Sequence, residues 1–400
     1  MRRYDKYWCA KWSLAGLCLL CYLLNACHKG RIEPLSHDEE VTLIFSAKLP
    51  SIPQGLKTYA LNEDDENLLS DVDVLVFTDD GSDMKFRYRT PGKIISQSSG
   101  AGEAYIKVRL WRTDADSRLV IIANARAAVN AFDFDIGITT QETVQSELVY
   151  ALGTGDKWHV TKDGGSDDFA PLPMWANYDV ESGINGNINI GSGEISLMRS
   201  LARVDVIVAD NVDEFELTEV WVFNSKANGL IIPNPNNLVD GVAQNPSLPS
   251  GGPVNNNDPL EYVTDGGNSI REIYLFEAAA QPINDGNATA LVIGGKYHTD
   301  TDPTYYRIDF RNPLNSNNPY PILRNHRYQI TITGALDAGY ENHVTAFESD
   351  DSVEPVSYKG FTGLYPAQPA NQRPSVKRTD IIPKSNGGIS YTVTAITENQ

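Results

Sequence analysis

Residues 71–81 read DVDVLVFTDDG, a run in which Val72, Val74 and Val76 recur at every second position before the turn at 79–81. Alternation with period two places successive side chains on opposite faces and is typical of a β-strand. Aspartate and glycine are turn residues, so they mark the end of that strand. The stretch therefore predicts a strand with one buried face.

The same signal recurs along the rest of the chain. VTLIFSAKL at 41–49 has its apolar residues on one face, and LVIIANA at 119–125 is a continuous apolar run typical of a strand buried on both sides. Helix-favouring composition is scarce after the N-terminus, and residues 127–150 are expected to hold the one modest helix. Further strands are expected at 105–111, 195–208, 219–223, 272–277, 290–295, 305–310, 327–333 and 389–396.

Length and turn content predict an all-β protein of two domains. A chain of 400 residues exceeds one ordinary core, and its 31 Gly and 22 Pro residues indicate frequent turns. Many short strands with turn-rich connections are typical of two tandem β-sandwiches, transthyretin-like or Greek-key-like, with long loops. Residues 50–70 contain two prolines and an acidic cluster and are expected to be a long, exposed loop. The expected layout is a leader at 1–26, an N-terminal sandwich at 27–193, a C-terminal sandwich at 194–350 and an arm at 351–400.

The N-terminus has the pattern of a bacterial lipoprotein signal peptide. Basic residues precede an apolar run at 12–24, which is too short to cross a hydrocarbon layer of ~30 Å comfortably. The run ends in Leu24-Asn25-Ala26-Cys27, which resembles a lipobox; the Cys27 thiol would take diacylglycerol, with palmitate as an acyl group. All four cysteines lie in the first 27 residues, so no disulfide is expected in the body. We expect a cell-surface protein attached to the outer membrane only through lipid.

The residue types that carry chemistry form no recognisable constellation. A net charge of −19 disfavours nucleic acid as a partner. The six histidines lack metal spacing, and neither a full phosphate loop nor a G-x-S-x-G elbow is present. The acidic clusters at 63–66 and 167–168 lack the ligand spacing of a calcium loop. We therefore predict no catalytic residue, no metal and no cofactor, and the protein is not expected to be an enzyme.

A second interpretation is a surface glycan-binding lipoprotein. Trp158 and Trp175 fall in predicted loops, where exposed rings can stack on sugars. Trp111 and Trp221 fall inside strand patterns, so they are expected to pack in the core. A third interpretation, a hydrolase, has no residue pattern in its favour.

Several segments in a shared order resemble the fimbrillin family of Bacteroidales pili, whose members are lipoprotein-precursor pilins. The likeness covers most of the mature chain and lies in the order of parts rather than in any single motif. The parts are the lipobox at Cys27, the strand at 41–49, DVDVLVFTDDG at 71–81, LVIIANA at 119–125, PLPMWAN at 171–177, SLMRSLARVDVIV at 196–208, YYRIDF at 305–310 and PILRNHRYQITITGALDAGY at 321–340.

This resemblance implies a structural subunit of a surface pilus that supports adhesion. In such pilins a trypsin-like protease cuts the loop after the first strand, the strand leaves, and another subunit's strand fills the open groove. The contact is head to tail, so it propagates into a homo- or hetero-polymer, the fimbria. Lys57 is the candidate cleavage site here, in place of the arginine usual in the family. The removable strand is 41–49, with Val41, Leu43, Phe45, Ala47 and Leu49 on its inner face.

The resemblance also implies a donor strand at 389–396, with Ile389, Tyr391, Val393 and Ala395 on its inner face. Two alternatives stay open: this strand can belong to its own domain, and 41–49 can be a permanent first strand. The missing arginine in 50–70 fits either a lysine-accepting protease or an uncut subunit that stays lipid-anchored at the pilus base. Stalk, tip and anchor positions are therefore all compatible with the sequence.

Overall fold

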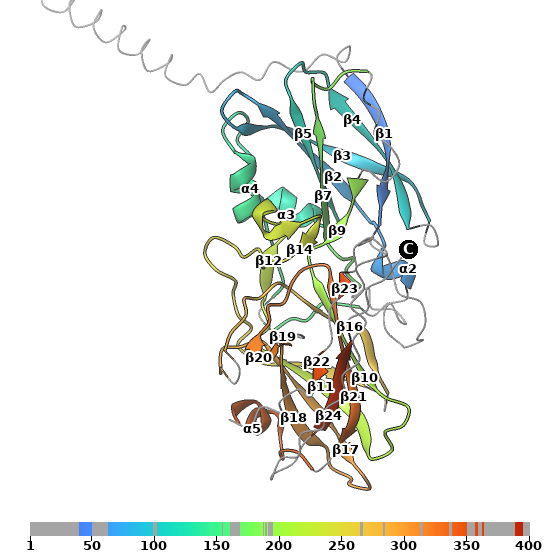
Figure 1. Cartoon of the computed structure of the whole chain (residues 1–400). Helices are drawn as coiled ribbons and strands as arrows, with labels where there is room; N and C mark the ends of the chain where they lie inside the picture. The colour runs from blue at the N-terminus through green and yellow to red at the C-terminus, as the bar shows by residue number, and fades with distance from the viewer. Residues whose placement is uncertain are drawn as a thin grey trace, which may run out of the picture. The chain divides into compact units, whose positions relative to one another are not determined.

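In the computed structural model, strands make up 49% and helices 9% of the residues that the structure describes, so the expected all-β class is confirmed (Figure 1). The structure describes residues 40–49, 63–98, 102–153, 155–160, 169–186, 188, 190, 195–264, 267–282, 285–312, 315–335, 338–349, 357–358, 362–363 and 389–394.

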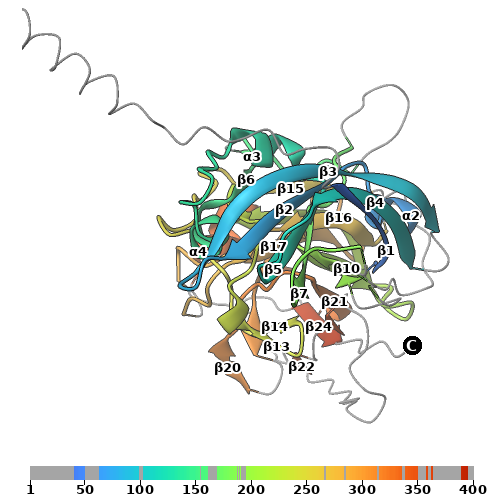
Figure 2. The same cartoon turned by 90° about the horizontal axis from the view of Figure 1, so that it is seen from above.

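The N-terminal sandwich is one eight-stranded sheet in the order β8-β1-β4-β3-β2-β5-β7-β9. The long strand β3 (Met84–Ser98) serves both layers, because its first part pairs with β2 and its last part with β4 (Figure 2). The inner faces of both layers share one hydrophobic core. The other strands are β1 (Glu40–Lys48), β2 (Val72–Asp79), β4 (Glu103–Trp111), β5 (Ser117–Ala123), β7 (Met174–Val180), β8 (Ile195–Ser196) and β9 (Met198–Arg199).

Burial follows the side-chain alternation wherever one face of a strand meets solvent. The even-numbered residues of β4 from 104 to 110 are buried, while those between them are not. β5 is instead buried on both faces, because α3 (Arg126–Ala131) and α4 (Gln141–Glu147) cover its outer side. There Val120 and Ile122 share a second cluster with Val129 and Val144.

Two further sheets make the C-terminal sandwich. The six-stranded sheet runs β16-β10-β21-β24-β22 with β23 beside β21, and the four-stranded sheet runs β15-β11-β17-β18. Their inner faces meet in one core, which includes Val204 and Ile330 from the first sheet and Val220 and Ile293 from the second. Helix α5 (His343–Glu348) packs on the other face of the four-stranded sheet through the same cluster that contains Phe223.

The strands of the six-stranded sheet are β10 (Ala202–Val208), β16 (Ser269–Leu275), β21 (His326–Ala335), β22 (Ser357–Tyr358), β23 (Thr362–Gly363) and β24 (Ile389–Thr394). Those of the four-stranded sheet are β11 (Phe215–Phe223), β15 (Leu260–Val263), β17 (Ala290–Tyr297) and β18 (Thr304–Asp309). Short pairs join β6 (Val149–Ala151) to β12 (Asn228–Leu230), β13 (Leu238–Val239) to β14 (Val242–Ala243), and β19 (Arg311–Asn312) to β20 (Asn315–Pro319). The remaining elements are α2 (Glu63–Glu66) and the 3₁₀ turn η2 (Pro235–Asn237).

Most strands expected from alternation are present, but β3, β7 and β15 were not predicted. β3 contains Pro91-Gly92, which breaks its sequence pattern at the point where the strand passes from β2 to β4. A Cβ on Gly92 would lie 2.9 Å from Val72 and 3.0 Å from Ile106, so both layers approach the backbone closely here. The expectation of a single helix in 127–150 was also wrong, because α3 and α4 both lie there and α5 lies outside it.

The expected exposure of the loop at 50–70 is wrong at its C-terminal end. Residues 63–66 form α2, and Asp65, Glu66 and Asn67 are buried. Distant arginine side chains hold this segment, as described below. Strands β8 and β9 pair with β1 and β7, so the chain enters the second sandwich at β10; the domain limits 27–193 and 194–350 remain proposals.

Candidate functional site

The first strand of the chain fills a place in the N-terminal core. Val41, Leu43, Phe45, Ala47 and Leu49 are each at most 8% exposed and belong to the core cluster that both layers share. Burying a large apolar side chain contributes about 1.5–3 kcal/mol. Removal of β1 would therefore expose an apolar groove to water at a large cost in free energy. The five side chains predicted to face inward are therefore together on one buried face.

β1 pairs with its neighbour β8 over only a short part of its length. In the eight-stranded sheet it lies between β4 and β8. Its pairing with β8 is parallel and joins only Ala47 to Ile195 and Lys48 to Ser196. Over most of its length β1 thus has one strand partner among the described residues, as a strand near a sheet edge does.

The remaining site predictions fall in different places. Cys27, Lys57 and Ala395 lie outside the described residues. Ile389, Tyr391 and Val393 lie on β24, which pairs antiparallel with β21 of the same chain. In that register Tyr391 is opposite Ile332, and Val393 is opposite Ile330.

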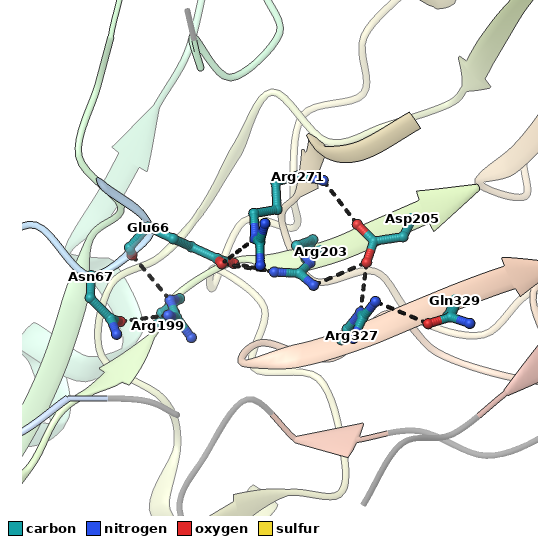
Figure 3. Close-up of polar contacts among 8 residues, drawn as sticks. All are labelled: Glu66, Asn67, Arg199, Arg203, Asp205, Arg271, Arg327 and Gln329. Atoms are coloured by element: carbon teal, nitrogen blue, oxygen red, sulfur yellow. Dashed lines mark hydrogen bonds and ion pairs between the residues drawn. The ribbon is translucent and has the colours of Figure 1, made fainter. Parts of the chain in front are cut away.

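A buried ion-pair network lies directly after the segment 50–62 that follows β1 (Figure 3). Glu66, at the end of α2, has a fully buried carboxylate that accepts from Arg203 Nη1 at 2.7 and 2.9 Å. Arg271 Nε lies 3.5 Å from the same carboxylate. Burial alone would raise the pKa of Glu66, but three neighbouring guanidinium groups, led by that of Arg203, lower it from 4.5 to about 2.

The network continues across the six-stranded sheet through Asp205. One of its carboxylate oxygens accepts from Arg203 Nη2 at 3.0 Å and from Arg327 Nε at 2.6 Å. Arg327 on β21 in turn donates to Gln329 Oε1 at 2.9 Å, and Gln329 is opposite Thr394 of β24. The contacts thus connect α2, which follows β1 in the sequence, to β21, the strand that pairs with β24.

The other oxygen of Asp205 stabilises an unusual backbone conformation. Arg271 has φ of 58°, in the left-handed region, where a non-glycine residue costs on the order of 1–3 kcal/mol. Its backbone N–H donates to Asp205 Oδ1 at 2.9 Å. The β10–β16 register shifts between Val204 and Val206, so the aspartate spans an irregularity in the ladder.

A second arginine holds the backbone beside Glu66. Arg199 Nη2 donates to Asn67 Oδ1 at 2.6 Å, and Arg199 Nε donates to the Glu66 carbonyl at 3.4 Å. Arg199 comes from β9, at the end of the first sheet, whereas Arg203 comes from β10 of the second. Residues 66 and 67 are therefore fixed by both sandwiches.

The tryptophans expected to stack on sugars are buried. Trp158 is 1% exposed, donates from Nε1 to the Ala170 carbonyl at 2.8 Å and packs against Tyr150 and Phe276. Trp175 is 6% exposed and belongs to the cluster under α3 and α4. The prediction that these rings are available for glycan stacking is wrong, because the loop that carries Trp158 packs onto the core and Trp175 lies on strand β7, in the cluster with α3 and α4.

Trp111 and Trp221, expected in the core, are partly buried at its margins. Trp111 packs edge to face with Tyr88 at 4.4 Å between ring centroids. Trp221 stacks on His343 of α5 at 3.8 Å. Both rings therefore have packing roles.

Within the described residues, no group of three or more His, Cys, Asp or Glu side chains could hold a metal ion. No helix in the described part of the chain is long and apolar enough to cross a membrane.

Comparison with known proteins finds similarity at the level of structure. No family model matches the chain, and no curated protein matches it. The tip fimbrial protein Mfa3 of Porphyromonas gingivalis has 15% identity and a TM-score of 0.44, over 74% of this chain and 95% of its own. A candidate cell adhesion protein of Parabacteroides distasonis has 13% identity and a TM-score of 0.47, over 91% and 100%. A fimbrial assembly protein of the same species has 16% identity and a TM-score of 0.37, over 74% and 92%.

Proposed function

We propose that this protein is a structural subunit of a cell-surface pilus, exported as a lipoprotein precursor and assembled by strand exchange after proteolysis. The observation that carries the proposal is the placement of β1. Five apolar side chains of β1 fill the N-terminal core, yet its second strand neighbour, β8, pairs with only two of its residues. A strand of this kind can be exchanged for another with the same alternation.

The exchange follows from the physics of an open sheet. Loss of β1 would uncover the ladder of β4 and an apolar groove, and both favour pairing with an incoming strand. The candidate donor, 389–396, has apolar residues at alternate positions, as β1 does. It must first leave β21 of its own chain, with which β24 pairs.

Localisation and partners follow from the same proposal. Cys27 would tether the precursor to the outer membrane, and a trypsin-like protease would cut at Lys57. The partners are then other pilin subunits, joined head to tail. The similar structures are described as a tip fimbrial protein, a cell adhesion protein and a fimbrial assembly protein. The role proposed here is structural, with no catalytic step.

The test is limited trypsin treatment of the membrane-bound, lipidated chain. We expect one early cut within residues 50–62, loss of the fragment that carries β1, and heat-labile ladders on gels of unboiled samples. Lys57→Ala should block both the cut and the ladders. Cut protein that stays monomeric at high concentration would contradict the proposal.

The donor strand is tested with a matched pair of charges. Val393→Asp places a carboxylate on the face predicted to enter the groove and should abolish the ladders. Thr392→Asp places the same charge on the opposite face and should leave them intact. Equal ladders from both variants would exclude 389–396 as the donor.

A further inference from the structure

The segment 66–70 is held by side chains that do not belong to β1. Besides the bonds of Arg199 and Arg203, Gln97 of β3 donates to the Asn67 carbonyl at 2.7 Å and accepts from Leu69 N at 3.1 Å. Asn124, directly after β5, donates to the Leu68 carbonyl at 2.7 Å and accepts from Ser70 N at 2.8 Å. Each of these contacts survives if β1 leaves.

The charged contact is the one that makes this attachment hard to undo. The carboxylate of Glu66 and the guanidinium of Arg203 are at most 1% exposed. Pulling Glu66 into water would leave Arg203, whose only other carboxylate contact among the described residues is Asp205, in a dry site with excess positive charge. Separating such a pair is far more costly than separating a surface ion pair.

We propose that Glu66 is a clamp that retains the chain end created by cleavage, so that the cut releases β1 and nothing after it. This inference rests on the proposed function, because it concerns the state after the cut. Residues 66–70 would stay fixed on β3, β9 and β10. One end of the vacated groove would then keep its shape, and Leu69, a buried member of the same core cluster as β1, would keep its place.

The clamp also defines where productive cleavage must fall. A cut within residues 50–62 leaves α2 and its contacts whole. A cut beyond Glu66 would separate the carboxylate from β2, and the free end could no longer order the groove. Glu66 is thus a positioning residue for strand exchange, with Arg203 and Arg199 as its partners.

Hydrogen exchange of the full chain, before and after trypsin treatment, tests the clamp. In the wild type, amides of residues 66–70 should stay protected in both states. In Glu66→Gln they should exchange at least about tenfold faster in both states, while amides of β5 stay protected. Asn67→Ala, which removes the 2.6 Å bond from Arg199 and leaves the carboxylate of Glu66 in place, should give a smaller increase and serves if Glu66→Gln does not fold.

Asp73→Asn is the matched control. Asp73 is also a buried carboxylate between two arginines, with Arg89 Nε at 2.8 Å and Arg126 Nε at 2.9 Å. It links β2 to β3 and α3, and its ion pairs do not involve residues 66–70, so the exchange of those amides should match the wild type. Wild-type residues 66–70 that lose protection on cutting, or a Glu66→Gln chain with wild-type protection, would overturn the clamp.

The design separates the clamp from strand exchange itself. Mass spectrometry of the cut sample reports whether the fragment with β1 has left. If the fragment stays bound, strand exchange fails, while the comparison of the uncut chains still measures the clamp. If the fragment leaves and residues 66–70 unravel, the clamp fails and strand exchange stands.

Discussion

A carboxylate out of contact with water needs charged donors, and Glu66 has them in Arg203 and Arg271. Removing one partner of a buried ion pair costs about 3–5 kcal/mol, whereas replacing the whole pair with well-packed apolar groups costs little. The network therefore does more to fix where α2 lies than to raise the free energy of unfolding. That is the property a clamp requires.

The contribution of Glu66 to stability should depend on pH in a defined window. Its pKa falls from 4.5 to about 2 on folding, so its contribution is complete above pH 4.5 and is lost as pH falls toward 2. The full shift corresponds to roughly 3 kcal/mol. In denaturant unfolding, the difference in free energy of unfolding between wild type and Glu66→Gln should be constant from pH 5 to 7 and should shrink below pH 4.5. A gap that widens on acidification would contradict this assignment.

Residue patterns alone could not have found this network. The cluster EDDE at 63–66 has the composition of a solvated loop, and the partner of Glu66 is 137 positions away. One signal was visible: Arg203 and Asp205 alternate with valines in a strongly apolar strand. On a sheet with one solvated face such charges would be exposed, and only tertiary packing buries them. Contacts between residues far apart in sequence also bury Trp158, which packs against Phe276.

Among the elements, β1 contributes five side chains to the core but pairs with β8 through only two residues. Its two faces should therefore respond differently to mutation. Phe45 is 2% exposed and Ile44 is 54% exposed. Phe45→Ala should lower the free energy of unfolding of the uncut chain by about 3–5 kcal/mol, while Ile44→Ala should change it by less than about 0.5 kcal/mol.

The same pair can be followed after cleavage. Once β1 has left, Phe45 no longer belongs to the folded protein, so Phe45→Ala and wild type should form ladders of equal heat resistance. Denaturant unfolding before the cut and gel ladders after it provide the two readouts. A stability gap that persists in the polymer would mean that β1 is still in place.

Strands were predicted correctly where the apolar residues either alternate with polar ones or form a continuous run. The alternation of β4 and the continuous apolar run of β5 locate both strands correctly. β3 fails that rule because it changes layer at Pro91-Gly92, and β7, MWANYDV, has no regular alternation. Pairing partners such as the short parallel contact between β1 and β8 depend on residues far apart in sequence, which no local pattern specifies.

At the scale of the whole molecule, stability must come from burial and strand ladders. No cysteine follows Cys27, so a disulfide cannot hold the body together. Each sandwich has its own core, and the described contacts of Arg199 and Arg203 bring both to residues 66–67. If outer strands are exchanged as proposed, each subunit buries apolar surface of its neighbour, and a fibre can be stable without covalent links.

Strand exchange, as proposed here, requires that β1 be absent from the assembled subunit. Purified pili should be dissociated, and the N-terminal residue of this chain should be determined by mass spectrometry. We expect a chain that begins within residues 50–62, with no peptide from 41–49 and with Glu66 still present. Fibre subunits that retain residues 41–49 would contradict it.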